Sequence, residues 1–120
     1  MDSNEASAQA ERSEIQRVVS WSEWTYAAKG HSVHTVEFAE CITALYVEDI
    51  RRTELVLTSE HYGCLDHERL KAIRAAGEVW VVTPLSTVGR AHSLLRGHVD
   101  RLVPYWTGDD QIKFGMPQIP

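Results

Sequence analysis

The chain is poor in cysteine and has no long hydrophobic run, and each shortage excludes a class of protein. Among its 120 residues, only Cys41 and Cys64 are cysteines, too few for a fold held together by several disulfides. The longest purely apolar stretch near the middle, residues 79–82, is far shorter than a membrane span. We therefore expect no membrane contact and two free thiols, with a disulfide between them left open.

Targeting signals and basic clusters are also missing. Residues 1–5 lack the basic and apolar regions of a secretory signal, so we expect a cytoplasmic protein. The 12 basic side chains are outnumbered by 17 acidic ones, giving a net charge of −5, and they do not cluster beyond Arg51 and Arg52. An acidic surface repels polyanions at long range, so we do not expect nucleic acid as a partner.

The composition is that of an ordinary globular domain. Apolar residues make up 43% and charged residues 24% of the chain, enough to bury a core without a metal or disulfides. Residues 1–12 are small, polar and acidic, which predicts a disordered N-terminal tail. Residues 13–120 are then expected to form a single α/β domain.

Two helices are predicted in the first half of the domain. Ser13 and Gln16 fit a capping box, and the apolar spacing that follows predicts a helix ending near Gly30. Apolar residues at intervals of three and four predict a second helix over residues 35–51. Because the spacing of apolar residues is irregular here, a strand over residues 33–42 remains the alternative.

The second half alternates between strands and helices. Short apolar runs predict strands at 54–58, 78–83, 101–106 and 111–116, with helices at 66–76 and 84–96 between the first three. Long crossovers imply parallel neighbours, whereas the short turn at 107–110 implies an antiparallel hairpin. The predicted order is ααβαβαββ, a mixed four-stranded sheet with a parallel βαβ core and a C-terminal hairpin, preceded by two N-terminal helices.

The carboxyl ends of the predicted parallel strands are the first candidate site. Ligands of open α/β sheets bind in the crevice beyond this edge, and a helix starting at Pro84 would direct its free N–H groups there. An enzyme or sensor would bind a small anion at this place, although some of these side chains have a simpler role as helix caps. The absence of a glycine-rich phosphate loop weighs against a nucleotide. The predicted ligand-binding residues are Ser59, His61, Thr83, Ser86, Thr87, Arg90 and His92.

Metal binding and catalysis have weaker support in the sequence. His61, Cys64 and His67 are spaced by three residues and are possible zinc ligands, but no Cys-x-x-Cys pair accompanies them. His92 falls in the apolar stripe of its helix, where a histidine is either hydrogen-bonded in the core or turned toward the crevice. We predict no metal and no cofactor, and we leave the catalytic residues unassigned.

Three further activities are disfavoured by particular residues. The segment 110–113 resembles the metal-binding pair of restriction-type nucleases, except that Gln111 stands where a carboxylate is needed. Ser59, Glu60 and His61 cannot form a catalytic triad, because neighbours on an extended chain point to opposite sides. A DNA-binding helix-turn-helix in the first half is disfavoured by its acidic residues, which are Glu37, Glu40 and Glu48.

Aromatic side chains near both ends of the chain carry the leading prediction. Trp21 and Trp24 lie on the first predicted helix, with Trp24 on its outer side, and Trp106 lies at the end of the third strand. Tryptophan is enriched where proteins meet their partners. We therefore expect a non-enzymatic domain that acts through protein contacts, as a homodimer or a regulatory subunit. The alternative is the anion-binding enzyme or sensor described above.

Overall fold

The protein forms one mixed sheet of six strands with helices on both faces. The computed structural model describes residues 3–39 and 42–120. The strands lie side by side in chain order, from β1 at one edge to β6 at the other. The elements are α1 (Ser3–Ala28), β1 (Val33–Ala39), β2 (Ile42–Val47), β3 (Arg52–Val56), α2 (His67–Ala76), β4 (Glu78–Pro84), α3 (Val88–Leu95), β5 (Arg101–Gly108) and β6 (Gln111–Phe114), with short 3-10 turns at Glu48–Ile50, Ser59–Cys64 and Leu85–Thr87.

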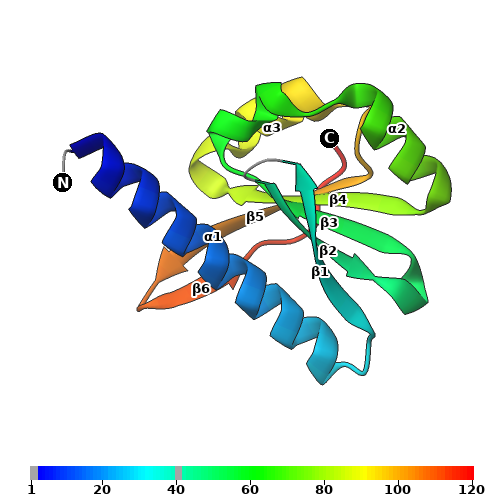
Figure 1. Ribbon diagram of the computed structural model, residues 1–120, viewed down its shortest axis with the longest axis horizontal. Helices are drawn as coiled ribbons and strands as arrows, with labels where there is room; N and C mark the ends of the chain where they lie inside the picture. The colour runs from blue at the N-terminus through cyan, green and yellow to red at the C-terminus, as the bar shows by residue number, and fades with distance from the viewer. Residues whose placement is uncertain (1–2, 40–41) are drawn as a thin grey trace.

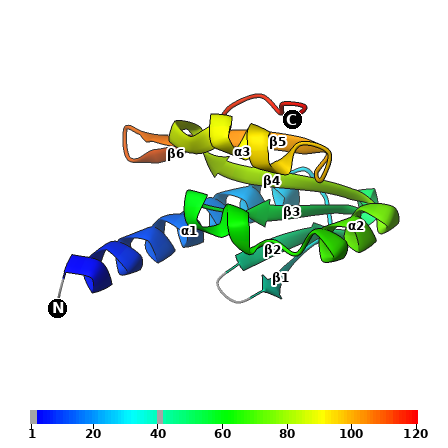
Figure 2. The same cartoon turned by 90° about the horizontal axis from the view of Figure 1, so that it is seen from above.

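The predicted parallel strands are present, within a sheet of six strands instead of the predicted four. β3 pairs in parallel with β4, and β4 pairs in parallel with β5, whereas the pairs β1–β2, β2–β3 and β5–β6 are antiparallel. Because both crossovers run in the same direction along the sheet, α2 and α3 cover the same face. The opposite face is covered by α1 (Figures 1 and 2).

The second predicted helix, residues 35–51, is wrong. This part of the chain forms β1 and β2, which pair as an antiparallel hairpin with an irregularity between Glu37 and Ala39. The strand alternative was therefore closer. β-branched residues such as Val36 and Thr43 favour strands, and pairing with β3 buries Ile42 and Leu45 on opposite faces of the sheet. The predicted four strands are thus six.

Two helix starts also differ from the predictions. α1 begins at Ser3 and runs for 26 residues, so the segment expected to be a tail is helical and Ser13 is not a cap. α3 begins at Val88, because Pro84 ends β4 and a 3-10 turn follows it. In contrast, Asp66 caps α2 as expected, by accepting hydrogen bonds from the N–H groups of the next turn. Within the described ranges, no helix combines the length and apolarity needed to cross a bilayer.

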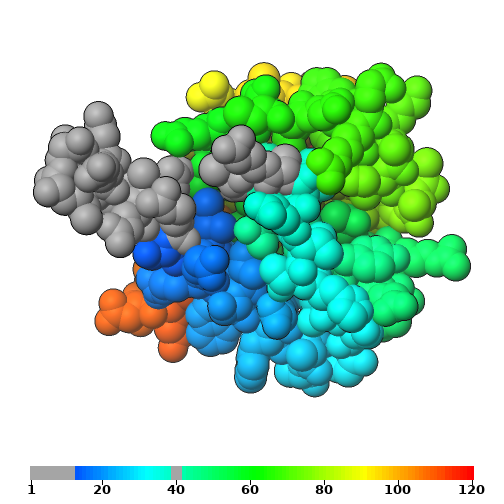
Figure 3. Space-filling model, viewed as in Figure 1, coloured from blue at the N-terminus to red at the C-terminus, as the bar shows by residue number. Residues whose placement is uncertain are grey.

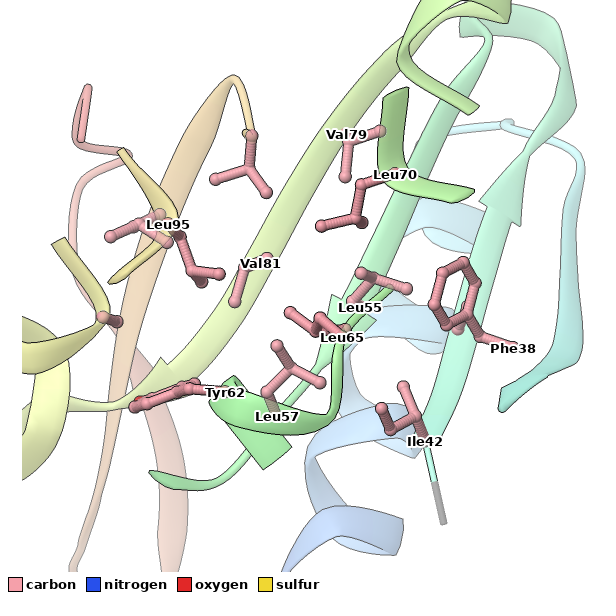
Figure 4. Packing of buried hydrophobic residues seen from close by; sticks show 14 residues of the cluster. Phe38, Ile42, Leu55, Leu57, Tyr62, Leu65, Leu70, Val79, Val81 and Leu95 are labelled. Atoms are coloured by element: carbon pink, nitrogen blue, oxygen red, sulfur yellow. The ribbon is translucent and has the colours of Figure 1, made fainter. Parts of the chain in front are cut away.

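The sheet separates two hydrophobic cores. Neighbouring residues of a strand point to opposite faces, so Leu55 and Val81 pack under α2 and α3 while Val56 and Val82 pack under α1. Leu70 and Leu95 supply the helical side of the first core (Figure 4). In the second core, the buried side chains of α1 are Ile15, Val18, Val19 and Ser22.

The turn between β5 and β6 offers a stabilising substitution. Asp109 and Asp110 both adopt the left-handed backbone conformation, with φ of 53° and 59°, as a two-residue hairpin turn requires. Glycine adopts this conformation without steric cost, so we expect Asp110→Gly to raise the free energy of unfolding by about 0.5–1 kcal/mol. Urea denaturation would measure the change.

Asp110→Ala is the matched control for this turn. It removes the same carboxylate but keeps a Cβ atom, so it should destabilise the protein. Arg17 donates to the backbone oxygen of Asp110 at 3.2 Å, and this contact survives in both variants. Equal effects of glycine and alanine would show that the carboxylate, and not the backbone conformation, determines stability here.

Candidate functional site

The carboxyl ends of β3 and β4 meet as predicted, but their hydroxyl groups bind one another. The hydroxyl of Tyr62 lies between those of Thr83 and Thr87, with a hydrogen bond to each and an oxygen–oxygen distance of 2.9 Å to Thr87. Thr83 is fully buried, and Thr87 is half-buried. These side chains therefore join the 3-10 turn after β3 to the turn after β4. Tyr62 was missed by the sequence analysis, because a tyrosine in a polar loop carries no signal of burial.

The other predicted residues of this edge are dispersed. The Nδ1 atom of His61 lies 3.2 Å from the backbone nitrogen of Thr58 and accepts its hydrogen bond, which closes the 3-10 turn. Ser59 is half-buried beside it, whereas Ser86 and Arg90 are exposed on the next turn and on α3. The structure thus brings Thr83 and Thr87 together through Tyr62 and gives His61 a capping contact.

His92 contacts the C-terminal tail. Its Nε2 atom lies 2.6 Å from the side-chain oxygen of Gln118, and the tail pairs with β5 through a bridge between Gln118 and Leu102. The ring is half-buried. It thus lies between the two predicted alternatives, a hydrogen-bonded histidine in the core and a histidine turned toward the crevice. This hydrogen bond fastens the end of the chain to α3.

The three possible zinc ligands do not form a metal site. Within the described residues, no group of three or more His, Cys, Asp or Glu side chains is placed to hold a metal ion. Cys64 is an exposed free thiol, whereas Cys41 lies outside the described residues. His67 turns toward another part of the chain and stacks on His98.

The outer face of α1 carries two exposed tryptophans. Trp24 is 65% exposed and Trp21 38%, and their rings meet edge to face with centroids 5.9 Å apart. They flank a shallow hollow of about 290 Å³ whose third wall is Ser20. Large apolar side chains of this kind seldom lie bare and adjacent unless the surface meets a partner. We call Ser20, Trp21 and Trp24 the tryptophan face.

Anchors at two edges of the sheet hold this face in place. Glu23 accepts a hydrogen bond from the hydroxyl of Thr35 on the edge strand β1, at 3.0 Å. Arg17 reaches the turn between β5 and β6 at the opposite edge. Figure 3 shows α1 at the surface between these two segments. The tryptophans therefore project from a helix that is fixed at both sides.

Trp106 does not belong to the tryptophan face. Its neighbour Tyr105 is buried in the core under α1, so the side chain of Trp106 points to the opposite face of the sheet. There it is 39% exposed and packs beside Gly115. The three predicted interface tryptophans thus lie on two separate surfaces.

A buried polar group lies under α1 and was not predicted. Glu54 is 5% exposed on the face of β3 that α1 covers, and its Oε2 atom has no hydrogen-bond partner among the described residues. Burial raises the pKa of this carboxyl above its ordinary value, and a hydrogen bond with Tyr26 and the charge of Arg52 only partly offset that effect. Burial likewise raises the pKa of Tyr26, so its hydroxyl stays protonated.

Arg52 connects this group to the surface. Its guanidinium lies 3.7 Å from the ring centroid of Trp80, donates to Glu78 at 3.1 Å and approaches the Tyr26 hydroxyl at 3.3 Å. That Arg52 and Glu54 lie close together could have been predicted from the sequence, because they are two residues apart and must share a face of their strand. Glu54 was overlooked because the residues that follow it form an apolar run.

Comparisons with known proteins assign neither a family nor a function to the chain. No family model, no curated protein and no solved structure was found to match the chain. Any function must therefore be argued from the geometry of the molecule itself.

Proposed function

We propose that the protein works by self-association, with the tryptophan face of α1 as the centre of a two-fold interface. The observation that carries this proposal is the pairing of Trp24, 65% exposed, with Trp21 on the rigidly anchored helix. Tryptophan is the residue type most enriched among those that dominate binding energy, and such residues lie near the centre of an interface.

The shape of the face favours a second copy of the same chain as its occupant. A two-fold interface brings the same patch together twice, so the patch must complement itself. Here a projecting indole, Trp24, lies beside the hollow that Ser20 and Trp21 border. The indole of one copy can therefore enter the hollow of the other, and the reverse contact follows by symmetry. α1, at 26 residues, is about 39 Å long and offers room for flanking contacts.

Analytical ultracentrifugation of the full chain tests this proposal. We expect a concentration-dependent dimer whose dissociation constant rises by about 30-fold in the Trp24→Ser variant, the effect of removing a dominant interface residue. Trp24 is 65% exposed, so the variant should keep its fold, which circular dichroism would verify.

Trp106→Ser is the matched control. It removes the same side chain, at a similar exposure to that of Trp21, from the other side of the sheet. This variant should dimerise like the unchanged protein. A protein that stays monomeric at every concentration, or a dimer weakened equally by both substitutions, would contradict the proposal.

A further inference from the structure

A groove at the start of α2 gathers cationic side chains in this acidic protein. It lies between α2 and the loop that joins α3 to β5, and its volume is about 550 Å³. This loop follows α3, on the face of the sheet away from the tryptophan face. The groove is lined by His67, Glu68, Lys71, Arg74, Ala75, Gly97 and His98.

Two imidazole rings stack at one wall of this groove. The ring centroids of His67 and His98 lie 3.9 Å apart, with 21° between the planes, although the residues come from different elements. Among the described residues, neither ring makes a hydrogen bond or an ion pair. Both rings line the groove, so their nitrogen atoms are available to a ligand that enters it.

The loop that carries His98 is held firmly against α2. Arg74 donates to the carboxylate of Asp100 at 3.1 Å and to the backbone oxygen of Gly97 at 2.7 Å. Asp100 in turn accepts a hydrogen bond from the backbone nitrogen of Val79 at 2.8 Å. Gly97 has a φ of +82°, a left-handed conformation that favours glycine. The wall of the groove is thus preformed, and Arg74 is committed to building it.

Lys71 supplies the remaining charge. It lies one helical turn after His67, on the same side of α2, and forms no ion pair within the part of the chain that the structure describes. Asp66 already accepts hydrogen bonds from the N–H groups of Glu68 and Arg69 at the start of α2, so the side chains are the main groups left to recognise a ligand. Glu68 is the acidic lining residue, and it would oppose an anion.

We propose that this groove binds the phosphate group of a small phosphorylated molecule, with His67, His98 and Lys71 as its ligands. Imidazolium and ammonium groups donate charge-assisted hydrogen bonds to phosphate oxygens. The groove is larger than a phosphate ion and continues along α2 to Ala75, which leaves room for the rest of the molecule. This inference is independent of the proposed self-association, because it concerns another surface.

NMR titration of the full chain with inorganic phosphate, at constant ionic strength set by chloride, tests the inference. We expect saturable shifts of the ring resonances of both His67 and His98. Lys71→Gln and His98→Phe should each weaken binding by about tenfold, the second while keeping a stacked ring. Glu68→Gln should tighten binding, because it removes the opposing charge.

Lys29→Gln is the control, since it makes the same charge change at the end of α1. It should leave the affinity for phosphate unchanged. Shifts that never saturate, shifts at only one of the two imidazoles, or equal losses in the Lys29 and Lys71 variants would overturn the proposal.

Discussion

Gly77→Ala is expected to lower the free energy of unfolding by about 3 kcal/mol, at the upper end of what overfilling a tight site costs. A Cβ atom on Gly77 would lie 2.2 Å from the backbone oxygen of Arg51, which cannot move aside as a side chain could. That oxygen also accepts the hydrogen bond from the backbone nitrogen of Glu78, at 3.0 Å. Relief of the clash must therefore separate the starts of β3 and β4, where their parallel pairing begins.

Gly89→Ala is the control for this substitution. A Cβ atom on Gly89 meets nothing within 4 Å, and the residue lies within α3, so alanine should stabilise the protein by about 0.5 kcal/mol. Urea denaturation of both variants measures the difference. If Gly77→Ala were as stable as the unchanged protein, the close contact between Gly77 and Arg51 would be absent in solution.

Glu54→Gln is expected to stabilise the protein at neutral and alkaline pH by about 1–3 kcal/mol, because a buried charged group without a full set of partners costs more to desolvate than a neutral one. The carboxyl of Glu54 is buried beneath α1, with one oxygen unpaired among the described residues. Glutamine keeps the shape and an acceptor oxygen for Tyr26, but it cannot ionise. The variant should therefore avoid the free-energy cost of burying a charge, which the unchanged protein bears once Glu54 is ionised.

The pH dependence of this effect follows from the direction of the shift. Because burial raises the pKa of Glu54 in the folded state, folding favours its protonated form. The stability that this residue contributes is complete below its unfolded pKa and is lost as the pH rises through the raised folded pKa. The unchanged protein and Glu54→Gln should thus be similar in acid, and they should diverge as the pH increases.

Urea denaturation from acidic to alkaline pH measures both curves. Other titrating groups, such as Asp49, affect the two proteins equally and cancel in the difference. Glu37→Gln, a change at an exposed carboxyl on β1, should follow the unchanged protein throughout. Parallel curves for Glu54→Gln and the unchanged protein would contradict a charged and buried Glu54.

The second half of the fold could be predicted from the sequence because its signals are local. The apolar run at 78–83, the Asp66 cap and the Gly77 stop each act within a few residues, and crossover length determines the parallel pairing. The first half could not be predicted in the same way. The spacing of apolar residues within 33–47 fits either a helix or a strand, and only pairing with β3 selects the strand.

The candidate sites depend on contacts that no spacing reveals. Exposure of Trp24 was predictable from the helical face that it occupies, but the anchors of α1 at both sheet edges were not. The stack of His67 on His98 joins residues 31 positions apart, across a strand and a helix. The hydroxyl groups expected to meet a ligand instead bind Tyr62, which only the three-dimensional arrangement shows.

The position of α1 has a consequence for how the chain is made. α1 is synthesised before every strand of the sheet, yet its buried residues, such as Val18, pack in one core with Val103, Tyr105 and Ile112 from β5 and β6. Synthesis is slow relative to local helix formation, so α1 must wait until β5 and β6 have emerged. During that interval its apolar stripe stays uncovered, and a chain truncated before residue 101 would never bury it completely.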